Sequence, residues 1–264
     1  MYDFSYHRPA SLEDAAALLG KAEDGVLMAG GQTLIPTLKQ RLAQPSDVID
    51  MRDIAGLDGI AVLGNTVEIG AMARHGAVAA AADVQKAIPA LARLAGRIGD
   101  PQVRNQGTIG GSLATNDPAA DYPAAVLALN ATVHTDRREI AADDFFTGLF
   151  ETALDDSEII TRVSFPLPER AGYAKFPNPA SRYAIVGVMA AHLGGSVRVA
   201  VTGAGACVFR VRDMEAALAG EFSADAVADI AVPPDGLNED IHASAEYRAH
   251  LVTVMAKRAV AAAD

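Results

Sequence analysis

Cysteine is nearly absent from the sequence, and this scarcity excludes several kinds of site. The 264-residue chain contains one cysteine, Cys207. It therefore cannot form an internal disulfide, an iron–sulfur cluster or a zinc–thiolate centre, which need two to four thiolates. The six histidines are scattered, with no HExxH motif and no carboxylate at metal-ligand spacing. We expect no metal site built from this chain alone.

Basic residues and long apolar runs are also scarce. The chain has 22 lysines and arginines against 33 aspartates and glutamates, a net charge of -11, so its field repels polyanions such as nucleic acids. No apolar run approaches the ~20 residues that cross a bilayer. The N-terminus shows no cationic segment followed by an apolar one. We expect a cytoplasmic protein with no membrane span and no nucleic-acid partner.

Hydrophobic periodicity predicts a mixture of helices and strands. The predicted helices cover residues 12–22, 73–81, 88–96, 213–219 and 244–262, and the predicted strands cover 26–28, 48–49, 60–63, 67–69, 131–134, 159–165, 172–176, 183–192, 197–201 and 207–211. The segment 26–38 reads as strand, glycine turn and helix, and 60–69 as a hairpin. Because a run of strands and then helices follows Pro168, we place a domain boundary near 168–172.

Two glycine-rich segments about 80 residues apart carry the clearest functional signal, AGGQT at 29–33 and TIGGS at 108–112. Paired glycines let the backbone approach a ligand and aim successive N–H groups at one point, which suits phosphate oxygens. The hydroxyl side chains in both loops add O–H donors. Each loop alone could be a tight turn forced by packing. Together with the acid-bearing segment NDPAAD at 116–121, they fit a dinucleotide held from both sides.

Other nucleotide-binding and nucleophile motifs are missing from the sequence. There is no GxxxxGK[ST] segment, which excludes a nucleoside-triphosphate P-loop. A GxGxxG fingerprint also fails, because Gly203 and Gly205 are followed by Val208 where the third glycine belongs. No GxSxG elbow or Cys/His nucleophile pair is present. We therefore name no catalytic acid, base or nucleophile.

The two loops and their flanking segments, LIPTLKQRLAQPSDVIDMRDI and DPQVRNQGTIGGSLATNDPAADYPA, resemble the FAD-binding medium subunits of molybdenum hydroxylases. The medium subunit of aerobic carbon monoxide dehydrogenase is the nearer relative, and the xanthine dehydrogenase flavin domain a more distant one. The resemblance implies an α+β fold. A two-lobed FAD-binding domain of the vanillyl-alcohol-oxidase (PCMH) type would occupy 1–168, with lobes of about 1–56 and 57–168. A small C-terminal α+β domain, an antiparallel sheet with helices, would occupy 169–264.

The resemblance also implies which residues hold FAD non-covalently. The residues matched to the two cofactor-binding loops are Met28, Ala29, Gly30, Gly31, Gln32, Thr33, Leu34, Thr108, Ile109, Gly110, Gly111 and Ser112, and those of the segment that follows are Asn116, Asp117 and Asp121. Asp121 would accept hydrogen bonds from ribityl or ribose hydroxyls. Ile160 and Lys175 match residues that approach the cofactor, and Tyr183 an aromatic side chain set against the isoalloxazine ring.

From the residues alone, these positions could equally have structural roles that do not involve a cofactor. Asp121 also fits an acid in the first turn of a helix, Ile160 a core residue, Lys175 a solvated lysine and Tyr183 a strand residue. Where carbon monoxide dehydrogenase relatives often have His, Ser and Asn, this chain has Gln32, Thr33 and Ser112. The replacements keep hydrogen-bonding ability but do not favour carbon monoxide as the substrate.

The resemblance implies the electron-transfer subunit of a larger oxidoreductase. FAD here would take electrons from a small [2Fe-2S] ferredoxin-like subunit, fed by a large molybdopterin subunit, and pass them to an external acceptor. The assembly would be a dimer of heterotrimers. Two alternatives remain open on the residues, a stand-alone flavin oxidoreductase and a non-catalytic nucleotide-binding or scaffold subunit. The sequence identifies neither the substrate, which could be carbon monoxide, a purine, an N-heterocycle or an aldehyde, nor the terminal acceptor.

Overall fold

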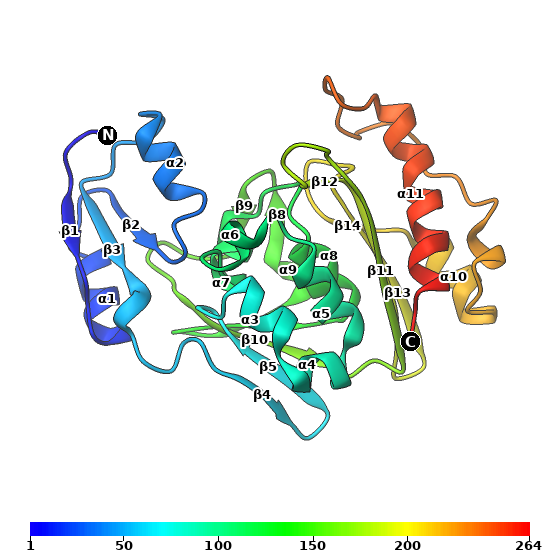
Figure 1. The fold of residues 1–264 in the computed structure, drawn as a ribbon, viewed down its shortest axis with the longest axis horizontal. Helices are drawn as coiled ribbons and strands as arrows, with labels where there is room; N and C mark the ends of the chain where they lie inside the picture. The colour runs from blue at the N-terminus through cyan, green and yellow to red at the C-terminus, as the bar shows by residue number, and fades with distance from the viewer.

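The computed structural model describes all residues from 1 to 264, and its N-terminal lobe is a small parallel sheet with strand order β1-β3-β2 (Figure 1). The elements of this lobe are β1 (Ser5–His7), α1 (Leu12–Leu19), β2 (Gly25–Met28), α2 (Leu34–Lys39), β3 (Asp47–Asp50) and a 3-10 turn (Met51–Asp53). The Ser11 hydroxyl caps α1 by accepting the Asp14 N–H. The helix ends at Leu19, earlier than predicted, because the chain turns at Gly20 to enter β2.

The middle lobe is a five-stranded antiparallel sheet, order β4-β5-β10-β6-β7, covered by short helices. Its elements are β4 (Ile60–Leu63), β5 (Thr66–Gly70), α3 (His75–Ala80), α4 (Ala82–Ala87), α5 (Pro89–Gly96), α6 (Pro101–Arg104), α7 (Ile109–Thr115), α8 (Tyr122–Ala128), β6 (Thr132–Thr135), β7 (Glu139–Ala141), α9 (Ala142–Phe145), β8 (Phe146–Gly148), β9 (Glu151–Thr152) and β10 (Ile160–Pro166). The predicted hairpin is confirmed as β4–β5, with Gly64 at φ 61° in its turn.

The alanine-rich region after the hairpin differs from its prediction. The expected helices at 73–81 and 88–96 are three helices, because α4 fills the segment between them. Ala81 ends α3 and begins α4, and Pro89 opens α5 at a position whose N–H has no intrahelical use. The short helices α6 to α9 had no clear periodic signal, since a helix of four to seven residues shows two turns at most.

The C-terminal sheet is antiparallel with order β11-β12-β13-β14, and helices cover it. Its elements are β11 (Arg170–Pro177), β12 (Ala184–Leu193), β13 (Ser196–Thr202), β14 (Phe209–Arg210), α10 (Arg212–Gly220), a 3-10 turn (Asp225–Val227) and α11 (Ala245–Ala261). Alternate residues of β12 point to opposite faces. Val186 and Val188 pack with Met255 of α11, whereas Met189 packs with Leu127 of α8.

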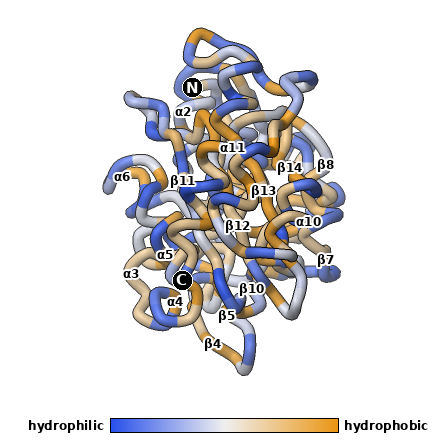
Figure 2. The backbone as a smooth tube through the Cα atoms, turned by 90° about the vertical axis from the view of Figure 1, so that its right-hand side faces the viewer, coloured by the Kyte–Doolittle hydropathy of each residue, from blue (hydrophilic) through white to orange (hydrophobic).

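Both faces of the C-terminal sheet are therefore buried, one under α10 and α11 and the other against the middle lobe. In Figure 2 much of the chain along β13 and around α11 is orange, that is, apolar. One continuous hydrophobic cluster crosses residue 168, because Tyr173 and Met189 share it with Phe165. The two regions are thus packed together by apolar side chains, whatever the position of the domain boundary. None of the helices is long and apolar enough to cross a membrane.

Candidate functional site

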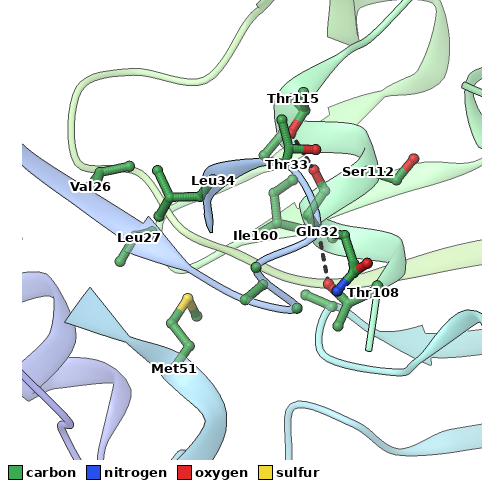
Figure 3. A pocket seen from close by; sticks show the side chains of 18 of the residues that line it. Val26, Leu27, Gln32, Thr33, Leu34, Met51, Thr108, Ser112, Thr115 and Ile160 are labelled. Atoms are coloured by element: carbon green, nitrogen blue, oxygen red, sulfur yellow. Dashed lines mark hydrogen bonds between the residues drawn. The ribbon is translucent and has the colours of Figure 1, made fainter. Parts of the chain in front are cut away.

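A cavity of about 840 Å³ lies where the N-terminal lobe meets the middle lobe. Figure 3 shows Val26, Leu27 and Leu34 entering it from the N-terminal lobe, and Ser112 and Thr115 from α7. The loops before β10 and β12 complete its wall. Its volume lies within the roughly 300–1,000 Å³ of pockets that bind small molecules and cofactors.

The two glycine loops predicted from the sequence lie against each other in this wall. A Cβ atom on Gly30 would stand 2.1 Å from the carbonyl oxygen of Gln106, just before the second loop. A Cβ atom on Gly111 would stand 3.5 Å from the Ala29 side chain. The close approach of the two chains at Gly30 therefore requires the absence of a side chain there.

The first loop presents a run of unused backbone donors. The consecutive amide N–H groups from Ala29 to Leu34 donate to no other group of the protein, and all these residues line the cavity. Gly31 has φ 70°, the left-handed conformation that lets neighbouring amides converge on one point. The side chains of Gln32 and Thr33 form no hydrogen bond within the chain, so they add free polar groups. This loop can hold an anion with neutral donors alone.

The second loop works differently from its prediction. Most of its amides are already used: those of Ile109 and Gly110 donate to the carbonyl groups of Ala73 (3.1 Å) and Ala71 (2.8 Å), and that of Gly111 to the Thr108 hydroxyl (3.2 Å). The glycine at 110 serves packing, since a Cβ there would lie 2.6 Å from that of Ala71. What this loop still offers a ligand is the Thr108 N–H, which donates to no group of the protein, and the free hydroxyl of Ser112.

Three further residues expected at the cofactor do not line the cavity. Met28 is buried in a small cluster with Leu38 and Val48, and Ile109 is fully buried in the main core cluster. Asn116 ends α7 in the left-handed conformation (φ 44°), and its amide donates to the carbonyl groups of Gly148 (2.9 Å) and Glu151 (2.7 Å). Asn116 therefore ties the β8–β9 hairpin to α7.

Asp121 lines the cavity, whereas Lys175 does not. The two side chains form a buried ion pair. The Lys175 Nζ atom lies 2.9 Å from Asp121 Oδ1, and the Tyr173 hydroxyl donates to the same oxygen at 2.5 Å. Burial raises the pKa of the Asp121 carboxyl, and the Lys175 ammonium opposes this rise. The lysine expected at the cofactor is thus the buried partner of the aspartate.

The remaining predicted residues, Asp117, Ile160 and Tyr183, line the cavity. Ile160 begins β10 and is 6% exposed, whereas the Tyr183 side chain stands just before β12 and the residue is 46% exposed. Burial raises the pKa of the Tyr183 hydroxyl, and the Asp117 carboxylate raises it further. The structure therefore provides an apolar contact and an aromatic contact on the walls beyond the glycine loops.

Several lining residues were not predicted, because they come from turns without a motif. Glu23 and Asp24 lie before β2, residues 156–159 precede β10, and His75 begins α3. The Nδ1 atom of His75 is buried without a hydrogen-bond partner, and so is the hydroxyl of the neighbouring Tyr122. A lone histidine carries no sequence signal. His75 lies at the second loop because its N–H donates to the Gly107 carbonyl (2.9 Å) and its ring lies against Gly107.

The buried imidazole of His75 predicts a specific loss of stability in acid. Burial, with help from Arg104, lowers its pKa from 6.5 to about 4. Between these two values the unfolded chain binds more protons than the folded one, so acidification from pH 7 to pH 5 should cost about 2 kcal/mol through this residue. Urea unfolding of His75→Leu should show a pH-dependent loss smaller by that amount. The exposed His250→Leu control should keep the parent dependence, and equal losses in all three proteins would refute the assignment.

Comparison with known proteins places the chain among flavoprotein subunits. A family model described as "FAD binding domain in molybdopterin dehydrogenase" matches residues 2–168. The chain is 40% identical to the nicotine 6-hydroxylase medium subunit of Paenarthrobacter nicotinovorans, over 97% of this chain and 95% of that protein. It is 36% identical to the carbon monoxide dehydrogenase medium chain of Hydrogenophaga pseudoflava, over 98% of this chain and 96% of that protein. A chain in the structure of reconstituted CO dehydrogenase from Oligotropha carboxidovorans superposes on this protein with a TM-score of 0.89 at 33% identity. The match covers 98% of this chain and 97% of that one.

Proposed function

The chain belongs to the family of FAD-binding domains of molybdopterin dehydrogenases, and from this premise we propose that the 840 Å³ cavity holds FAD non-covalently. The run of unpaired amides from Ala29 to Leu34 carries the proposal. These donors suit the oxygens of a pyrophosphate, and each bond to a charged oxygen contributes roughly 1.5–3 kcal/mol. Bound there, FAD would supply the electron-accepting and electron-donating chemistry.

The residues of this chain would bind and orient the cofactor. The first loop would hold the pyrophosphate, with the free Ser112 hydroxyl as a further donor from α7. Asp121 would accept hydrogen bonds from sugar hydroxyls, because a carboxylate has acceptor capacity beyond its contacts with Lys175 and Tyr173. Ile160 and Tyr183 would pack against the rings and exclude water. We also propose that an FAD-binding domain at 1–168 supplies all of these contacts except that of Tyr183, which comes from a C-terminal domain at 169–264.

We propose further that the chain works within a multi-subunit enzyme as its medium subunit. Its single cysteine cannot hold a cluster, so electrons must reach it from another polypeptide. A small [2Fe-2S] subunit would donate these electrons after receiving them from a large molybdopterin subunit. Relatives that are named medium chains of dehydrogenases support the existence of such partners. A dimer of heterotrimers fits this arrangement.

The visible spectrum of the purified chain, with and without added FAD, tests the proposed site. We expect flavin absorption bands that stay with the folded protein and leave it on denaturation. Ser112→Ala should weaken FAD affinity about tenfold, since one hydrogen bond to a charged group is lost. The exposed Ser5→Ala is the matched control and should leave affinity unchanged. A folded chain that takes up no FAD would refute the proposal and favour a scaffold role.

A further inference from the structure

The ammonium of Lys175 has all its donors occupied inside the protein. Its side chain is 1% exposed, and Nζ donates to Asp121 and to the carbonyl oxygens of Arg97 (2.8 Å) and Arg182 (2.9 Å). A lysine has three N–H donors, so none is left for a ligand in the cavity. This lysine, expected to approach the cofactor, instead joins three segments of the chain.

One of these segments carries Tyr183, the aromatic residue of the cavity wall. Arg182 adopts φ 64°, an unusual conformation for a residue with a side chain, and its carbonyl is the group that Lys175 holds. The rest of the loop closes on Asn178, whose carbonyl accepts the Arg182 N–H (2.9 Å) and whose own N–H donates to the Tyr183 carbonyl (2.8 Å). The lysine is therefore the only side chain that connects the Arg182 carbonyl to the protein interior.

Tyr183 also stands at a boundary between two spaces. It lines the large cavity and a second one of about 440 Å³, whose other wall includes Asn238 and the buried Arg248. Ser181 and Asp117 line both cavities as well. A shift of the loop would therefore open one cavity toward the other.

We propose that Lys175 is a positioning residue: acting through the Arg182 carbonyl, it fixes the Tyr183 ring as the partition between the two cavities. Asp121 and Tyr173 hold the ammonium in place for this task. The proposal rests on the proposed function only in taking the larger cavity as the FAD site. Without the tether, the loop keeps its backbone bonds to Asn178 and Ala119 but loses the side-chain link that holds the Arg182 carbonyl, so Arg182 can leave its strained conformation and the ring screens the cofactor less well on that side.

A single-tryptophan reporter tests the tether directly, because the chain contains no tryptophan. In a Tyr183→Trp protein, fluorescence anisotropy reports nanosecond motion of the side chain at this position. The test variant adds Lys175→Met with Asp121→Asn, so that no unpaired charge is left buried and Tyr173 keeps an acceptor. We expect the anisotropy to fall by about half, without any FAD present.

The control for general destabilisation is Arg198→Met, which breaks a different ion pair, to Asp143, and should leave the reporter unchanged. Equal anisotropy with and without Lys175 in folded protein would overturn the proposal. Should the methionine variant not fold, Lys175→Gln with Asp121→Asn keeps polar groups in the cluster and should give a smaller loss of the same sign. Because the anisotropy is measured without cofactor, a chain that binds no FAD would count against the proposed function and leave this test intact.

Discussion

Gly30→Ala should weaken FAD binding at least a hundredfold. Its Cβ would lie 2.1 Å from the Gln106 carbonyl oxygen and 2.8 Å from the Gly107 Cα, and both are backbone atoms. Since neither can rotate away, the two loops must separate, at a cost of about 1–3 kcal/mol in stability. The shift also moves the amides from Ala29 to Leu34. Losing two bonds to a charged oxygen, at roughly 1.5–3 kcal/mol each, lowers affinity at least a hundredfold.

Flavin titration and urea unfolding measure the two effects of Gly30→Ala separately. Gly59→Ala is the matched control, because a Cβ there meets nothing within 4 Å and its backbone does not have a positive φ. The control should bind FAD as the parent does and change stability by less than about 1 kcal/mol. If Gly30→Ala binds FAD with parental affinity, the close contact of the two loops is not what builds the site.

The sequence predicted the local parts of the fold well. The hairpin at 60–69, the long helix α11 and the strand–turn–helix around Gly30 depend on nearest-neighbour chemistry, and all three are found. The fold class and the family resemblance are confirmed as well, by structural matches over nearly the whole chain. A loop of paired glycines after a buried strand was signal enough to locate one wall of the cavity.

What the sequence missed depends on contacts between distant segments. The amides of Ile109 and Gly110 in the second loop looked free, but Ala73 and Ala71, more than 30 residues earlier, accept their hydrogen bonds. Lys175 matched a cofactor-binding position, yet its burial beside Asp121 follows from the packing of β11 on the middle lobe. His75 gave no signal, because an isolated imidazole gains meaning only from its surroundings.

Removing either charge of the Asp121–Lys175 pair should destabilise the protein by about 3–5 kcal/mol. The side chains are 3% and 1% exposed, so the charge left behind is buried without a counter-ion. The double variant Asp121→Asn with Lys175→Met removes both charges and keeps an acceptor for the Tyr173 hydroxyl. It should therefore lose much less stability than the two single variants predict together, and a double-mutant cycle from urea unfolding measures this coupling.

The pH dependence of Lys175→Met gives the same prediction an independent check. Burial raises the pKa of the Asp121 carboxyl, and without Lys175 its strongest opposing charge is gone. A carboxyl whose pKa is higher in the folded chain than in the unfolded chain supports the folded state in its protonated form. That support is complete below the unfolded value near 4 and is lost as the pH rises through the folded value. Relative to the parent, Lys175→Met should therefore recover stability as the pH is lowered from 7 toward 4, whereas Asp121→Asn, which has no such carboxyl, should not. A Lys175→Met deficit that is constant over this range would mean that Asp121 is not a buried, ionised partner of the lysine.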